Sequence, residues 1–261
     1  MTEPTAPSVP AGTPCWYELN TSDLAAAGAF YADALGWTVA DSGMPGMTYH
    51  LATASDGGMV AGLGPVPEAD VPPSWVLYFT SDDCDATAAA IAQDGGSVAV
   101  QPMDIPGTGR FAICADPQGA VFGILQPAPM EGPMGSPAFN QQATGHGNWH
   151  DLMTTDPQAG FAFYAKRFAW ATGEAMDMGE MGTYQLFGID GNDIGGIMPL
   201  GDAPRSAWLP YFGVDGVEAA IARITGGGGS IHHGPAEVPG GAHIAVATDP
   251  QGGWFAIVGP R

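Results

Sequence analysis

Basic side chains are scarce in this sequence. Its 261 residues include six Lys and Arg against 27 Asp and Glu, which gives a formal net charge of -21 at pH 7. A charge of this sign and size repels phosphate backbones and anionic lipid surfaces. We therefore expect no nucleic-acid partner and no membrane association, and an anionic substrate would depend on one of the few arginines.

Cysteines and long apolar runs are also few. The three cysteines, Cys15, Cys84 and Cys114, are odd in number and lack CxxC-type spacing, which argues against a disulfide framework and a structural zinc site. No run approaches the roughly 18 apolar residues that a membrane-spanning helix needs. Residues 1–12 lack the basic and apolar segments of a secretory signal, so we expect a cytoplasmic protein.

The chain contains an internal duplication. Trp16 and Trp149 open two similar segments and lie 133 positions apart. The same offset relates "ADPQGAVFGIL" (115–125) to "TDPQGGWFAIV" (248–258) near the end of each copy. A repeat that keeps one offset over more than a hundred residues indicates two domains of the same fold.

The domain limits follow from this offset. We expect domains at 13–128 and 146–261, a disordered leader at 1–12 that is rich in Pro, Ser and Thr, and a linker at 129–145 that is rich in Pro and Gly. Because both copies are present in one chain, a monomer with internal pseudo-twofold symmetry is the simplest assembly, and a dimer is the alternative.

Within each repeat, a strand, a helix and three strands occur twice. Residues 15–21 alternate as a strand does, and 22–37 form an amphipathic pattern with Ser22 or Asp23 as N-cap and Gly36 after its end. A second round begins at "SWVLYFTS" (74–81). The pattern predicts an α+β fold of four βαβββ modules.

This order of modules resembles the vicinal oxygen chelate superfamily, the group of glyoxalase I, bleomycin-resistance proteins and extradiol dioxygenases. The resemblance rests on a "D-L…F-Y…L-G-W" opening and a "D-P-x-G" turn before the last strand. The matching residues are Asp23, Leu24, Phe30, Tyr31, Leu35, Gly36, Trp37, Asp116, Pro117 and Gly119, with Asp156, Phe163, Tyr164, Trp170, Asp249, Pro250 and Gly252 in the second repeat. The resemblance implies that each pair of modules forms a glyoxalase/bleomycin-resistance-type domain, a curved mixed sheet that holds a ligand in its cup, often with a divalent metal.

The metal ligands of that superfamily have no counterparts here. Alignment places their positions at Trp16, Val76, Gly123, Trp149, Leu209 and Ala256. None of these side chains suits a hard or borderline cation, so we expect no cofactor. A shift of one residue would bring in Tyr17 and His150, and His146, His232, His233 and His243 are unassigned, so a divalent metal on displaced ligands stays an alternative.

The alignment also predicts which side chains line each cup. Because strand side chains alternate, Trp16, Glu18 and Asn20 share one face, and the aligned position of Trp16 makes it the cup face. The duplication adds Asp151 beside Trp149 in the second repeat, and Tyr78 and Tyr211 point inward from later strands. A carboxylate among apolar groups can act as general acid or base, and a phenol can donate to an oxyanion, so these four are the catalytic candidates: Glu18, Asp151, Tyr78 and Tyr211.

Further residues are expected to bind the ligand. Trp149 and Trp254 would supply aromatic walls beside Trp16 and Asn20. Arg110 and His243 occupy equivalent positions after glycine-rich loops, where either could meet an anionic group at the rim.

Three functions agree with these observations. The first is a glyoxalase-like, metal-independent enzyme in which Glu18 or Asp151 moves a proton on a small oxygenated or aromatic metabolite. The second is a non-catalytic protein that binds a small molecule such as an antibiotic. The third is a metal-dependent lyase or dioxygenase with non-standard ligands.

Overall fold

The computed structural model describes residues 9–128 and 137–261. Most of the expected leader and part of the expected linker lie outside the described residues. Among the described residues, no helix has the length and apolar character needed to span a bilayer.

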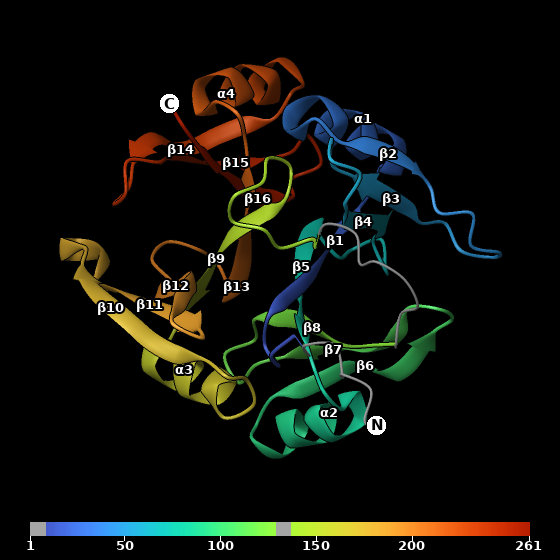
Figure 1. Cartoon of the computed structure of the whole chain (residues 1–261), viewed down its shortest axis with the longest axis vertical. Coiled ribbons are helices and arrows are strands. Elements are labelled where there is room, and N and C mark those ends of the chain that lie inside the picture. Colours follow the sequence, from blue (N-terminus) through green and yellow to red (C-terminus); the bar gives the residue numbers. More distant parts are fainter. Residues whose placement is uncertain (1–8, 129–136) are drawn as a thin grey trace, which may run out of the picture. The chain divides into compact units, whose positions relative to one another are not determined.

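Each repeat contains eight strands and two α-helices (Figure 1). The elements of the first repeat are β1 (Pro14–Thr21), α1 (Leu24–Leu35), β2 (Thr38–Asp41), β3 (His50–Thr53), β4 (Met59–Pro65), β5 (Ser74–Thr80), α2 (Cys84–Gln93), β6 (Ser97–Ile105), β7 (Gly109–Ala115) and β8 (Val121–Pro127). Those of the second repeat are β9 (Gly147–Thr154), α3 (Pro157–Ala165), β10 (Ala171–Asp177), a short 3-10 helix (Gly179–Met181), β11 (Thr183–Ile189), β12 (Asn192–Pro199), β13 (Ala207–Gly213), α4 (Val217–Gly226), β14 (Ser230–Glu237), β15 (His243–Thr248) and β16 (Trp254–Gly259).

The strands form two mixed sheets with the same topology. One has the order β2-β3-β4-β1-β5-β8-β7-β6 and the other β10-β11-β12-β9-β13-β16-β15-β14. In the first sheet β1 pairs in parallel with β4 and β5 with β8, while the hairpin strands are antiparallel. The predicted α+β fold, with four βαβββ modules in two glyoxalase-type domains, is confirmed.

The first helix begins where the sequence predicted. The Asp23 carboxylate accepts from the Ala26 N–H at 3.0 Å, and Gly36 ends α1 with a φ of 72°, in the left-handed region that glycine adopts without strain. Asp156 caps α3 in the same way, accepting from the Ala159 N–H at 3.0 Å. The opening motif of each repeat therefore contains a helix N-cap.

The chain forms two compact units, and each unit combines modules from both repeats. One unit, called unit 1, contains residues 78–128 and 152–207; the other, unit 2, contains 15–77 and 208–261 with the start of β9. In unit 2, α1 packs beside α4 (Figure 1). In unit 1, Arg167 after α3 donates to the Ala90 carbonyl of α2 at 2.9 Å.

A tyrosine–aspartate hydrogen bond joins the two repeats within each unit. In unit 2 the Tyr31 hydroxyl of α1 donates to Asp249 Oδ2 at 2.9 Å. In unit 1 the equivalent Tyr164 of α3 donates to Asp116 Oδ2 at 3.1 Å. Both aspartates belong to the "D-P-x-G" turns and both tyrosines to the "F-Y" pairs, so two motifs that are distant in sequence bind each other.

Each of these aspartates also organises its own turn. Asp249 Oδ1 accepts from the N–H groups of Gln251 and Gly253 at 2.9 and 2.8 Å, and both aspartates are only 3% exposed. Burial raises the pKa of Asp249 and of Asp116, while the hydrogen bonds that they accept oppose the rise. Both carboxyl groups therefore bind a proton more tightly in the folded chain than in the unfolded chain.

Substitution of Tyr31 tests this bond. In Tyr31→Phe, Asp249 Oδ2 loses a donor, and the indole N–H of Trp75, which donates to the Tyr31 oxygen at 3.0 Å, loses an acceptor. Leaving buried polar groups unpaired costs about 1–3 kcal/mol, so we expect a loss of that size in the free energy of unfolding. Urea unfolding measures it, and a variant as stable as the parent chain would show that the bond contributes nothing.

The raised pKa of Asp249 predicts the direction of a pH effect. The stability that its protonation contributes is fully present below the ordinary carboxyl pKa and is lost as pH rises through the folded value. The parent chain should therefore gain stability relative to Asp249→Asn as pH falls from 7 towards 4. Urea unfolding of both proteins at several pH values checks this, and a difference that moves the other way contradicts the assignment.

Candidate functional site

The first strand of repeat 1 separates its side chains by face as expected. Tyr17 and Leu19 are buried, whereas Trp16, Glu18 and Asn20 are half-buried on the other face. We call the face that carries Glu18, and the equivalent face of the second sheet, the open face. The helices cover the opposite face of each sheet.

Tyr49 joins Trp16 and Glu18 on the open face. Its hydroxyl accepts from the Trp16 indole N–H and donates to Glu18 Oε2, both at 3.1 Å. Burial, and next the Glu18 carboxylate, raise the pKa of Tyr49 well above its usual range, so the phenol stays protonated and acts as a donor. No pattern in the sequence singled out Tyr49.

Glycine makes room for Tyr49. A β-carbon at Gly62 of β4 would overlap the Tyr49 hydroxyl, so the ring lies directly on the glycine backbone. The second repeat has the same arrangement, since a β-carbon at Gly196 of β12 would overlap the Tyr184 ring. The segments "TYHL" and "TYQL" share this tyrosine, but they lie 135 rather than 133 residues apart, which hid the match.

In the second repeat, Asp151 and Tyr211 meet. The Tyr211 hydroxyl of β13 donates to Asp151 Oδ2 of β9 at 2.6 Å, and both residues are 5% exposed. Tyr211 pairs with Ala256 of β16, the position where the resemblance predicted a metal ligand. Two of the four catalytic candidates are thus in direct contact, and Trp149 lies two residues before Asp151, on the same face of β9.

Tyr78, the third catalytic candidate, lies on Gly123 in unit 1. A β-carbon at Gly123 would overlap the Tyr78 ring, and Phe111 lies beside the ring with a centroid separation of 6.4 Å. Gly123 is another position at which the resemblance predicted a metal ligand. In this chain the space above that position contains an aromatic ring.

Arg110 and His243 lie on the helix-covered faces. Arg110 shares its side of β7 with buried Ala112 and Cys114. It donates to Asp85 of α2 at 2.6 and 3.0 Å and to Asp104 at 2.9 Å. These carboxylates raise the pKa of Arg110, and its charge is matched within unit 1.

His243 is the counterpart of Arg110. It shares its side of β15 with Ala245 and Ala247, which are buried under α4. The structure therefore places neither expected rim cation on the open face that carries the carboxylates.

His150 and His146 have separate partners. His150 Nε2 and the Tyr17 hydroxyl are 2.7 Å apart in the buried core of unit 2. His146 lies with Nδ1 2.7 Å from the Pro137 carbonyl and Nε2 3.2 Å from Asp56. Across the residues that the structure describes, no three His, Cys, Asp or Glu side chains are grouped to hold a metal ion.

Trp254 and His232 form a stacked pair on the second sheet. Their ring centroids are 4.3 Å apart with an interplanar angle of 29°, and Trp254 remains 49% exposed. His232 Nε2 is 3.0 Å from the Thr248 hydroxyl, which fixes the imidazole. This pair brings together one expected ligand-binding residue and one unassigned histidine.

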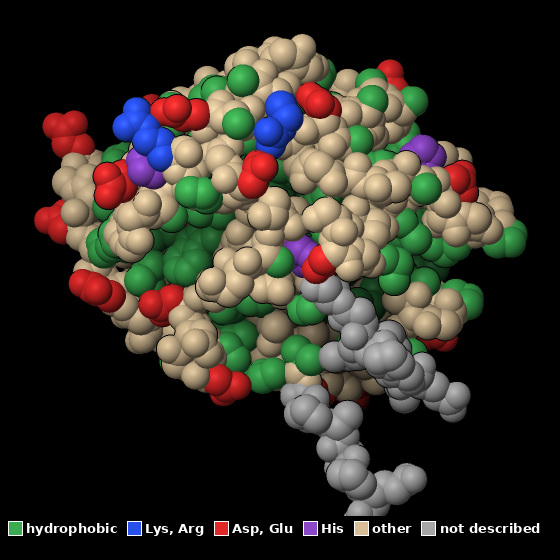
Figure 2. Space-filling view, turned by 45° about the horizontal axis from the view of Figure 1, so that its top comes forward, with side chains coloured by type: hydrophobic (Ala, Val, Ile, Leu, Met, Phe, Trp, Pro, Cys, Tyr) green, Lys and Arg blue, Asp and Glu red, His purple; other side chains and the backbone are tan. Residues whose placement is uncertain are grey.

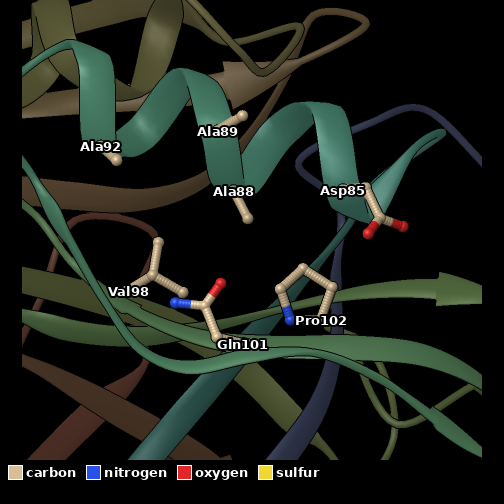
Figure 3. Close-up of a pocket in the computed structure, with 7 residues that line it drawn as sticks. All are labelled: Asp85, Ala88, Ala89, Ala92, Val98, Gln101 and Pro102. Carbon is tan, nitrogen blue, oxygen red and sulfur yellow. The ribbon is translucent and has the colours of Figure 1, made fainter.

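Outside the open faces, α2 and β6 enclose a pocket of about 350 Å³ (Figure 3). It is lined by three alanines of α2 and by Asp85, Val98, Gln101 and Pro102. Arg110 donates to the Asp85 carboxylate. On the face shown in Figure 2, acidic side chains are scattered with few basic ones between them. Neither feature presents a cationic surface.

Comparison with known proteins identifies the relatives of this arrangement. The family model described as Glyoxalase/Bleomycin resistance protein/Dioxygenase superfamily matches residues 15–124 and 146–257. "Putative glyoxylase CFP32" of Mycobacterium tuberculosis is 44% identical over 95% of both chains. "Anthracycline biosynthesis protein DnrV" of Streptomyces peucetius is 32% identical over 95% of this chain and 93% of its own.

A solved structure supports the fold. The Mn(II)-bound glyoxalase from Novosphingobium aromaticivorans superposes with a TM-score of 0.65 at 18% identity, covering 96% of this chain and 82% of that one. At this identity the likeness concerns the fold alone.

Gly62→Ala tests whether the Tyr49 ring needs a glycine beneath it. The added methyl group would displace the phenol and break its bonds to Trp16 and Glu18, and overpacking of this kind costs about 1–3 kcal/mol. Gly226→Ala is the control, because nothing lies within 4 Å of the methyl group there. Urea unfolding should show the loss only in Gly62→Ala; equal stabilities would mean that the Tyr49 ring needs no glycine beneath it.

Proposed function

Because this chain belongs to the Glyoxalase/Bleomycin resistance protein/Dioxygenase superfamily, we propose that it is a metal-independent enzyme that moves a proton on a small oxygenated or aromatic metabolite. Asp151 is the proposed general base and acid. The observation that carries this proposal is the 2.6 Å hydrogen bond from Tyr211 to the buried Asp151 carboxylate.

This geometry suits proton transfer next to a carbonyl group. Tyr211 donates to Oδ2 of Asp151, and the carboxylate takes a proton from the carbon beside the substrate carbonyl. The electron pair of the broken C–H bond forms the enolate. Asp151 is then neutral, so the Tyr211 hydroxyl can turn to donate to the enolate oxygen, and return of the proton to carbon or oxygen completes an isomerisation.

Glu18 is the equivalent candidate in the first repeat. Tyr49 donates to it as Tyr211 donates to Asp151, but Glu18 is half-buried whereas Asp151 is 5% exposed. Low exposure strengthens electrostatic interactions in a site, so we assign the chemistry to Asp151.

Metal independence rests on the donor atoms present. Trp149, Leu209 and Ala256 align with the family's ligand positions in the second repeat, and these side chains fit no divalent cation. Proton transfer through Asp151 and Tyr211 needs no metal.

Sequestration of a ligand without chemistry is the second candidate. The half-exposed Trp254 offers an aromatic surface that functions in binding without any proton transfer. Turnover distinguishes the two candidates, since a binder would show none.

We further propose that repeats 13–128 and 146–261 act as the two domains of a cytoplasmic monomer. The tyrosine–aspartate bonds already supply each repeat with its partner inside the chain. Light scattering should give the mass of one chain, and the mass of two would overturn this assembly.

The general-base assignment is tested with 2-tetralone, a bicyclic ketone with exchangeable protons beside its carbonyl. In D2O the protein should accelerate deuterium uptake, measured by NMR, and Asp151→Asn should lower the catalysed rate about 100-fold or more. Asp202→Asn, on an exposed residue, is the matched control and should keep the parent rate.

Two results would overturn the proposal. If Glu18→Gln lost deuterium exchange while Asp151→Asn kept it, the general base would be Glu18 of the first repeat. Loss of the rate on dialysis against EDTA, with recovery on addition of Mn(II), would show that a metal participates.

A further inference from the structure

The stacked pair of Trp254 and His232 lies on the same face of the second sheet as Asp151 and Tyr211. Thr248 pairs directly with Trp254. His232 lies at an irregularity of β14, and its ring stacks on Trp254 with Nε2 3.0 Å from the Thr248 hydroxyl, which places it on the same side. Directly paired residues, and residues two apart in a strand, share a face. Ala256, two residues beyond Trp254, pairs with Tyr211, so all these side chains project from the open face of unit 2.

The opposite face confirms this orientation. Phe255, Ala245 and Ala247 alternate with these residues and are completely buried, and α4 packs on their strands. Trp254 is 49% exposed although one of its faces rests on an imidazole. The other indole face is therefore open to a ligand.

The position of Trp254 sets the size of what it can bind. The Cα of Trp254 is one strand away from that of Tyr211, about 4.8 Å, and two residues along the strand, about 3.3 Å each. Because these two displacements are perpendicular, the two Cα atoms are roughly 8 Å apart. A two- or three-carbon carbonyl compound at Asp151 would not reach the indole. A flat ligand of several fused rings can stack on Trp254 with one end while a carbonyl at its other end meets Tyr211.

We propose that the substrate is a planar, fused-ring aromatic carbonyl compound that stacks on Trp254. This inference rests on the proposed function, because it uses Asp151 and Tyr211 as the reactive end of the same site. His232 is a positioning residue that holds the indole parallel to the ligand, and Thr248 fixes the imidazole. The net charge of -21 favours a neutral or cationic ring system over an anionic one.

The binding test uses 1,8-dihydroxyanthraquinone, a neutral three-ring carbonyl compound, with intrinsic tryptophan fluorescence and calorimetry as readouts. Trp254→Ala should weaken binding about fivefold to tenfold, the effect expected from loss of one aromatic stack. Trp254→Phe should restore most of the affinity. Met103→Ala, at an equally exposed apolar residue of unit 1, is the control and should bind as the parent chain does.

Turnover separates this inference from the general-base assignment. Asp151→Asn should bind the anthraquinone with parent affinity while losing deuterium exchange. Trp254→Ala should raise the KM for exchange into 2-tetralone but leave that for acyclic hydroxyacetone unchanged. Equal anthraquinone affinity in the parent and Trp254→Ala would overturn the stacking inference alone; undiminished exchange in Asp151→Asn would overturn the general base and leave the binding result standing.

Discussion

The hydrogen bond between a helix tyrosine of one repeat and a turn aspartate of the other is the interaction on which the architecture depends. It attaches α1 to the β15–β16 turn in unit 2 and α3 to the β7–β8 turn in unit 1. Each carboxylate also holds its turn through backbone N–H groups, so one buried side chain shapes a local turn and a long-range contact together. A buried carboxyl group needs this set of donors, because desolvation disfavours its charge.

On the open faces, tyrosine rings lie over glycine and alanine residues, whose small side chains leave room for them. Tyr78 rests on Gly123, and Tyr211 lies beside Ala256. Gly123 and Ala256 are positions at which the superfamily resemblance predicted a metal ligand. Tyr49 rests on Gly62 in the same manner. The phenol hydroxyls of Tyr49 and Tyr211 then reach the carboxylates of Glu18 and Asp151, so each of these two carboxylates accepts a hydrogen bond from a tyrosine.

The repeat, the module order and the helix caps could be predicted because they depend on local patterns and one constant offset. The sequence predicted that Asp151 and Tyr211 point into the same cup, but not that they form a hydrogen bond. The alternation of a strand determines the face on which a side chain lies, but not which side chain of a neighbouring strand it contacts. Tyr49 was missed because a two-residue insertion before Tyr184 breaks the offset. Arg110 was expected at the rim, but its side of β7 is the one that α2 covers. Its partner Asp85 is brought there by the packing of α2, and Asp104 by the pairing of β6 with β7.

The crossed tyrosine–aspartate bonds also bear on how the chain arose. A single repeat carries both the tyrosine and the aspartate, yet each bond joins groups from different repeats. A lone repeat would leave the tyrosine hydroxyl without its acceptor and one carboxylate oxygen of the turn without this donor, whereas a second copy would supply both. In an ancestor with one repeat, a second copy could have supplied these partners, and gene duplication with fusion would have made that pairing permanent while freeing the two cups to diverge.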